Sequence, residues 1–177
     1  KYVAQAIESI LAQKTKYRYE ILIGDDCSND DTRKVLEFYK KKYPDRIRVF
    51  YSKRNVKATK NGFHLMKEAK GKYFAFCDGD DCWRDEHRLE REVDFLESHS
   101  AFSGICGKVS LIDEDGKEIP TNEIASNAQF WYQEASEYSY KDFEAWKMPG
   151  QISACMIRNF MLELKGDLSI YYKAHPM

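Results

Sequence analysis

The segment YFAFCDGDDCW, residues 73–83, decides the fold prediction, because an apolar run leads directly into a cluster of carboxylates. Its first half, residues 73–77, is apolar and partly aromatic, which is typical of a buried strand. Groups that lie just past the carboxyl ends of strands in a parallel α/β sheet often bind ligands. The carboxylates of Asp78, Asp80 and Asp81 stand at that position and repel one another unless a cation offsets them, which indicates a Mg²⁺ or Mn²⁺ site. An ordinary acidic turn is the alternative that this segment alone leaves open.

A second acidic cluster occurs at an equivalent place earlier in the chain. Residues 20–24 have the composition of a short strand, and Asp25 and Asp26 follow it directly. Ser28, with Asp31 three residues later, fits a capping box for the next helix. Capping alone would explain these acidic residues, but two clusters at the carboxyl ends of two predicted strands favour a ligand-binding role over an ordinary turn.

The remaining pattern alternates between helices and strands. We expect helices over residues 3–13, 32–42, 58–70, 85–98, 139–147 and 159–165, and strands over 20–24, 46–51, 73–77, 103–112 and 151–157. Alternation of this kind predicts an α/β fold with a mostly parallel sheet flanked by helices. The polar and aromatic segment 121–139 lacks clear periodicity, and its pattern leaves three interpretations open: a lid or acceptor-side loop, a disordered segment, or a poorly patterned helix.

Composition narrows the class of protein. A chain of 177 residues forms one domain with its own core. The net charge of -1 gives no basic field for nucleic acid. No apolar run reaches the roughly 20 residues that span a bilayer. The five cysteines are scattered without a C-x-x-C pair, which favours reduced thiols in a cytoplasmic protein.

Taken together, the motifs resemble those of the family 2 glycosyltransferases, which have the Rossmann-like GT-A fold. Residues 2–13 resemble the first helix of that family, and residues 23–32 (IGDDCSNDDT) resemble its V-D-D-x-S-x-D-x-T motif. Asn55 with Lys60-Asn-Gly62 resembles N-x-G…R-N-x-G. Residues 71–83 resemble the segment that carries the D-x-D motif. A lone D-x-D is a weak signal, whereas this ordered series is a strong one.

The resemblance implies site residues for a nucleotide-sugar donor. In this family the acidic pair after the second strand contacts the base or ribose, which gives that role to Asp26, with Asp25 beside it. The D-x-D equivalent is Asp78-Gly79-Asp80. It places Asp78 near the ribose and diphosphate and Asp80 on a Mn²⁺ or Mg²⁺ ion, which makes these two the metal ligands. The resemblance also implies donor-binding roles for the following residues: Asn55, Lys60 and Asp81.

The chain departs from the family pattern in three ways. The family begins with a buried strand that this sequence lacks, and Lys60 stands where the family often has Arg. The family's catalytic base is a late Asp, which we expect beyond Met177, with Asp167 as the weaker candidate. We therefore expect one incomplete domain, with residues 1–98 as the donor half and 99–177 as the acceptor half, and no sugar transfer by these 177 residues alone.

The resemblance thus implies a metal-dependent inverting transferase. It would move a sugar from a nucleotide-sugar, UDP-linked by family preference, to a glycan or lipid-linked acceptor in surface polysaccharide synthesis. We expect a cytoplasmic protein, with peripheral association at the inner face of a membrane left open, and no nucleic-acid partner. Two alternatives also remain open, namely a non-catalytic domain that binds a nucleotide-sugar or a partner, and a nucleotidyltransferase.

Overall fold

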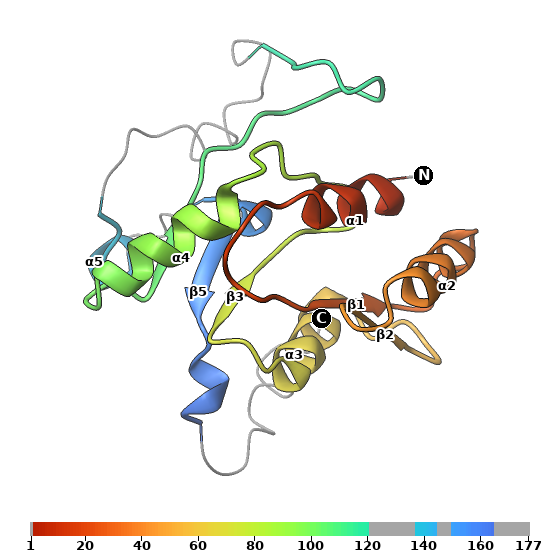
Figure 1. Cartoon of the computed structure of the whole chain (residues 1–177), viewed down its shortest axis with the longest axis horizontal. Helices are drawn as coiled ribbons and strands as arrows, with labels where there is room; N and C mark the ends of the chain where they lie inside the picture. Colours follow the sequence, from red (N-terminus) through yellow and green to blue (C-terminus); the bar gives the residue numbers. More distant parts are fainter. Residues whose placement is uncertain (1, 121–136, 145–149, 165–177) are drawn as a thin grey trace.

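The computed structural model describes residues 2–120, 137–144 and 150–164 (Figure 1). The helices are α1 Val3–Leu11, α2 Thr32–Lys42, α3 Ala58–Glu68, α4 Arg88–Ser98 and α5 Tyr140–Glu144. The strands are β1 Ile21–Asp25, β2 Ile47–Tyr51, β3 Tyr73–Ala75, β4 Gly104–Cys106 and β5 Cys155–Arg158. Short 3-10 turns cover Ile152–Ala154 and Phe160–Leu162. The order of elements confirms the α/β class.

The strands form two small sheets (Figure 1). β1 and β2 are parallel, with Ile21 opposite Ile47 at one end of the pair and Asp25 opposite Tyr51 at the other. β5 lies between β3 and β4 and is antiparallel to both. The parallel pair follows from the β-α-β pattern of residues 21–51, in which α2 makes the crossover.

Each sheet has its own hydrophobic core. In the first core, Ile7 of α1 and Leu36 of α2 pack against Ile47 and the other apolar side chains of β1 and β2. On the other sheet, the fully buried Leu96 of α4 packs against Met156 of β5. The periodic apolar positions of α1, α2 and α4 therefore face their sheets, as their sequence patterns predict.

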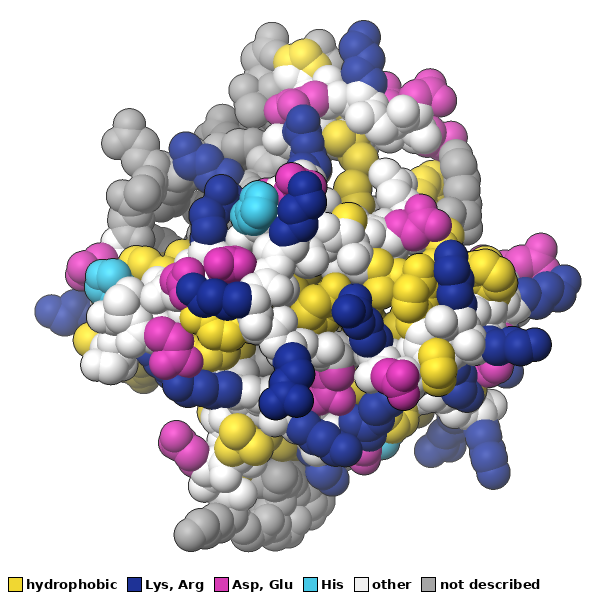
Figure 2. All heavy atoms as spheres, viewed as in Figure 1, with side chains coloured by type: hydrophobic (Ala, Val, Ile, Leu, Met, Phe, Trp, Pro, Cys, Tyr) yellow, Lys and Arg dark blue, Asp and Glu magenta, His cyan; other side chains and the backbone are white. Residues whose placement is uncertain are grey.

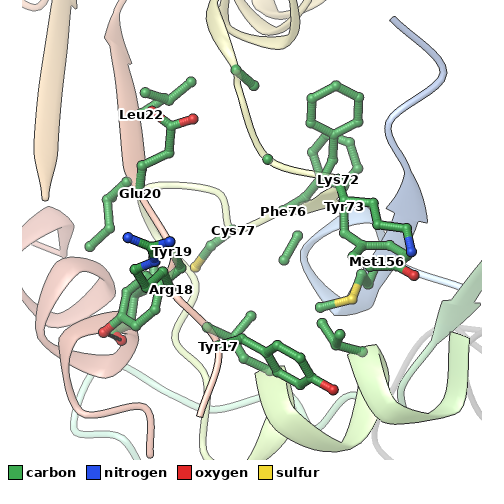
Figure 3. Close-up of a pocket in the computed structure, with 18 of the residues that line it drawn as sticks. Tyr17, Arg18, Tyr19, Glu20, Leu22, Lys72, Tyr73, Phe76, Cys77 and Met156 are labelled. Atoms are coloured by element: carbon green, nitrogen blue, oxygen red, sulfur yellow. Dashed lines mark hydrogen bonds between the residues drawn. The ribbon is translucent and has the colours of Figure 1, made fainter. Parts of the chain in front are cut away.

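An apolar cavity of about 400 Å³ lies between the facing edges of the two sheets. Leu22 and the residues before β1 line one side of it, and Tyr73, Phe76 and Met156 line the other (Figure 3). Neither β1 nor β3 pairs with another described strand along this side.

Several boundaries differ from the sequence predictions. The expected strand 151–157 begins later, at Cys155, because residues 152–154 form a 3-10 turn. The predicted capping box at Ser28 is wrong, since Asp31 occupies the N-cap position of α2 and makes no side-chain cap. The expected strand 103–112 is paired only at β4, and Ile112 instead bridges to Glu118 across the turn. Residues 121–136 of the proposed lid lie outside the described residues.

The expectation of five reduced thiols is wrong for two of them. Cys106 of β4 and Cys155 of β5 are directly opposite in the antiparallel pair and form a disulfide. Cys27, Cys77 and Cys82 are free. Sequence spacing could not predict the pairing, because 49 positions separate the two cysteines and only the strand register brings them together.

The surface in the view of Figure 2 mixes basic and acidic side chains, with apolar side chains reaching the surface between them. No helix among the described residues is long and apolar enough to cross a membrane.

Candidate functional site

The carboxylates of residues 78–81 lie on an exposed loop, here called the acidic loop, that follows β3. Asp78 and Asp80 are exposed and Asp81 is half-buried. The backbone N–H of Asp81 donates to the carbonyl of Asp78 at 3.1 Å, which closes a tight turn. Gly79 has room around it, since a Cβ there would meet no atom within 4 Å. The loop therefore presents Asp78 and Asp80 to solvent at the end of a strand, as predicted.

The electrostatics of this loop suit a bound cation. Partial burial, together with the negative charges of Asp81 and Asp80, raises the pKa of Asp78. Within the described ranges, no Lys or Arg forms an ion pair with any of the three carboxylates. A divalent ion near Asp78 and Asp80 would relieve the repulsion that the protein leaves uncompensated.

The donor set also limits which kind of metal site fits. Residues 2–120, 137–144 and 150–164 hold no group of three His, Cys, Asp or Glu side chains arranged around one metal position. Asp78 and Asp80 supply two carboxylates. Proteins usually provide one or two carboxylate ligands at sites where substrate phosphates complete the coordination of Mg²⁺. The residues thus fit a metal that is shared with a diphosphate, and they do not form an all-protein cage.

Asp25, at the end of β1, is a buried structural carboxylate. It accepts the Nε–H of Arg33 at 2.6 Å and the backbone N–H of Ser28 at 3.1 Å. Burial alone would raise the pKa of Asp25, but the hydrogen bonds from Ser28 and Arg33 outweigh that effect and lower the pKa below its ordinary value. Arg33 also donates to the carbonyl of Ser52 at 3.1 Å, so this carboxylate joins the loops that follow β1 and β2.

Asp26 holds the loop after β2 in place. Its two carboxylate oxygens accept the backbone N–H groups of Val56 at 2.7 Å and Lys57 at 2.8 Å. Cys27, directly after Asp26, and Lys57 both have positive φ, at 66° and 73°, a conformation that is uncommon for side chains other than glycine. Strained backbone of this kind persists where surrounding contacts determine it, often at ligand sites. Each oxygen of Asp26 keeps a second lone pair for a ligand N–H or hydroxyl.

The other predicted donor residues lie on the loop before α3 and on its first turns. Asn55 accepts the N–H of Lys57 at 3.0 Å and so helps to shape that loop. Lys60 is exposed and makes no ion pair among the described residues. Sequence reasoning missed Asn61, whose side chain donates to the carbonyl of Gly24 at 2.9 Å. Gly24 has to be small, because a Cβ there would lie 2.4 Å from the Oδ1 atom of Asn61.

Sequence reasoning also missed the residues that hold the acidic loop. The backbone N–H of Asp78 donates to the Oγ atom of Ser153 at 2.8 Å, and Gln151 donates to a carboxylate oxygen of Asp81 at 3.0 Å. On the other side of the loop, the backbone N–H of Trp83 donates to the Oγ atom of Ser9 in α1 at 3.0 Å. These contacts join positions about 70 residues apart, and no local pattern in the sequence indicates them.

The predicted residues therefore fall into two groups on three loops. Asp25, Asp26 and Asn55 organise the loops after β1 and β2, and the acidic loop follows β3. No hydrogen bond of these side chains within the described part of the chain joins one group to the other. Asp167, the weaker candidate for the catalytic base, lies outside the described residues.

Comparison with curated proteins identifies relatives over about two thirds of the chain. The putative teichuronic acid biosynthesis glycosyltransferase TuaG of Bacillus subtilis is 35% identical over 118 residues, which cover 67% of this chain and 45% of TuaG. The putative glycosyltransferase EpsE of the same organism is 36% identical over 114 residues, which cover 64% of this chain and 40% of EpsE. The matched part of this chain thus spans less than half the length of either relative.

Solved structures share the fold at low identity. Staphylococcus aureus TarS, residues 1–349, in complex with UDP superposes with a TM-score of 0.61 and 20% identity over 92% of this chain and 44% of that one. The mannosyltransferase PcManGT from Pyrobaculum calidifontis, in complex with GDP-Man and Mn²⁺, gives a TM-score of 0.54 and 18% identity over 61% of this chain and 32% of that one.

The family assignment rests on a match to most of the sequence. Residues 1–164 match the family described as glycosyl transferase family 2. That match includes both acidic clusters and the loop with Asn55 and Lys60. It also includes the turn before β5, which contacts the acidic loop. The chain belongs to glycosyl transferase family 2 and has the GT-A fold.

Proposed function

We propose that this chain forms the donor-binding part of a metal-dependent, inverting glycosyltransferase that uses a UDP-sugar. The observation that carries the proposal is the acidic loop, where Asp78 and Asp80 are exposed at the end of a strand without an ion pair to the described residues. The acceptor we propose is a glycan or lipid-linked chain in surface polysaccharide synthesis. The name of TuaG, a relative linked to teichuronic acid, supports that choice.

Four of the predicted residues have a physical task in this proposal. Asp80, with Asp78, would hold a Mn²⁺ or Mg²⁺ ion, which stabilises the negative charge that develops on a diphosphate leaving group. Asp26 keeps the loop after β2 in its strained conformation and accepts a hydrogen bond from the base or ribose. Lys60, exposed on the first turn of α3, supplies a positive charge for the donor. The complexes of TarS with UDP and of PcManGT with GDP-Man and Mn²⁺ support a nucleotide and a metal as ligands.

We propose that an Asp acts as the catalytic base of this transferase, with Asp167 as a candidate. Asp167 lies outside the described residues.

Calorimetric titration of UDP, with and without Mn²⁺, tests the donor site. We expect UDP to bind the wild-type protein with Mn²⁺ and to bind weakly without it. Asp80→Ala should abolish the metal-dependent part. Asp45→Ala is the matched control, because Asp45 is an exposed carboxylate just before β2, at the opposite end of the strands from the acidic clusters. Equal UDP binding with and without Mn²⁺, or equal loss in both variants, would contradict the proposal.

A further inference from the structure

The turn before β5 contacts the acidic loop at two points. The side chain of Gln151 donates to a carboxylate oxygen of Asp81 at 3.0 Å, and the hydroxyl oxygen of Ser153 accepts the backbone N–H of Asp78 at 2.8 Å. Gln151 also accepts the backbone N–H of Ser153, which fixes the side chain of Gln151 to the same turn. One short turn thus contacts the first and the last carboxylate residue of the acidic loop.

This turn is itself held firmly. Ser153 is buried, with 6% of its surface exposed. Its carbonyl accepts hydrogen bonds from Arg88 at 2.6 Å and from the indole N–H of Trp83 at 3.2 Å. Arg88 stacks over the ring of Trp83 and pairs with the buried Glu92 at 2.9 Å. Because Trp83 and Arg88 follow the acidic loop in the sequence, the turn before β5 is bound both to that loop and to the segment that follows it.

The contacts treat the three carboxylates differently. Asp81 has one oxygen engaged by a neutral amide donor, whereas the side chains of Asp78 and Asp80 make no hydrogen bond to the described residues. A carboxylate that is hydrogen-bonded in this way stays close to its donor. The contacts therefore leave the carboxylates of Asp78 and Asp80 without a protein donor among the described residues, whereas Gln151 restrains that of Asp81.

We propose that Gln151 and Ser153 are positioning residues that select Asp78 and Asp80 as the ligands of the metal–diphosphate unit and keep Asp81 out of it. The inference rests on the proposed function, since it concerns the same donor site. Releasing Asp81 would place an extra negative charge beside a diphosphate that is itself negative, and the repulsion would weaken nucleotide binding. Asp81 thus serves the site only while Gln151 restrains it.

The test measures UDP binding in the presence of Mn²⁺ by calorimetry, without any sugar transfer. Gln151→Met keeps the size of the side chain and removes its hydrogen bonds, and we expect the affinity to fall about tenfold. Asp81→Asn alone should change the affinity by less than about threefold, because the asparagine carbonyl can still accept from Gln151. In the Gln151→Met/Asp81→Asn double variant, the affinity should return to within about threefold of wild type, because the released charge is gone.

Ser153→Ala provides an independent arm of the experiment. It leaves the backbone N–H of Asp78 without its acceptor, and we expect about a tenfold loss of affinity for UDP with Mn²⁺. Ser153→Thr retains a hydroxyl and should recover most of that affinity. Circular dichroism and thermal unfolding of every variant show whether a loss arises from unfolding, and the rescue by a second substitution is a readout that a merely structural role would not give.

The outcomes separate this inference from the proposed function. Wild-type protein that fails to bind UDP with Mn²⁺ refutes the proposed function and this inference with it. Wild-type binding with no rescue of Gln151→Met by Asp81→Asn refutes the inference alone. The same holds if Asp81→Asn abolishes binding as Asp80→Ala does, because Asp81 would then be a ligand.

Discussion

Replacement of Asp25 by Asn tests whether the acidic pair after β1 is organised by a buried charge. The Asp25 side chain is fully buried, and its oxygens accept from Arg33 at 2.6 Å and Ser28 at 3.1 Å. Hydrogen bonds to a charged group contribute about 1.5–3 kcal/mol each. Asparagine keeps the acceptor for Ser28 but loses the charge that faces Arg33. We therefore expect the free energy of unfolding to fall by about 2 kcal/mol at pH 7.

The pH dependence of that difference is the sharper part of the prediction. The pKa of Asp25 in the folded protein is lowered below its ordinary value of 3.8. A lowered pKa means that the carboxylate stabilises the fold above the unfolded-state pKa, and that this contribution is lost as the pH falls through the folded-state pKa. The stability difference between wild type and Asp25→Asn should therefore be constant above about pH 5 and shrink as the pH falls below about 4.

Urea unfolding followed by circular dichroism at several pH values measures this difference. Comparing the two proteins at each pH cancels the titration of the other carboxylates, several of which also have a lowered pKa. Asp45→Asn, at an exposed position, should match wild type throughout. If Asp25→Asn is as stable as wild type at pH 7, or if the difference persists unchanged at pH 3, the charge of Asp25 does not organise these loops.

Three further predictions concern the fold. Leu96→Ala should lower the free energy of unfolding by roughly 2–5 kcal/mol, because Leu96 is completely buried against β5, and urea unfolding measures the loss. Gly24→Ala forces Asn61 away from the Gly24 carbonyl and should cost about 1–3 kcal/mol; an Asn61→Ala change in the same protein should then add little, and additive losses would contradict the contact. Thiol titration of the unreduced, denatured protein should find three free cysteines, and five after reduction, whereas five without reductant would refute the Cys106–Cys155 bond.

The sequence predicts the donor half of the fold well because its signals are local. α1, α2 and α4 carry apolar stripes at helical spacing, and β1 and β2 are short apolar runs joined by one helix, so a parallel pair follows. The D-x-D segment is correctly placed after a strand for the same reason. Cys106 and Cys155, in contrast, pair only through the antiparallel register of β4 and β5, which no sequence spacing encodes.

The site residues divide in the same way. The sequence identifies Asp78 and Asp80 by their motif and their position after a strand. No sequence pattern indicates Gln151 and Ser153, because their side chains form hydrogen bonds to residues about 70 positions away. Gln13 belongs to the same class. It is buried beside α4, where it accepts the N–H of Leu89 at 3.0 Å and donates to the carbonyl of Asp85 at 2.6 Å, and its place in the first helix motif gives no hint of that role. Motifs locate the carboxylates, and only the tertiary structure identifies what holds them.

The most direct test of the donor site is a crystal structure of the protein with UDP and Mn²⁺, with the metal located by its anomalous signal. We predict one manganese ion bonded to a carboxylate oxygen of Asp80 and to the diphosphate of UDP, with Asp78 beside it and Asp81 still hydrogen-bonded to Gln151. UDP bound at another place, or a manganese ion held away from the acidic loop, would contradict the central claim that this loop is the diphosphate site.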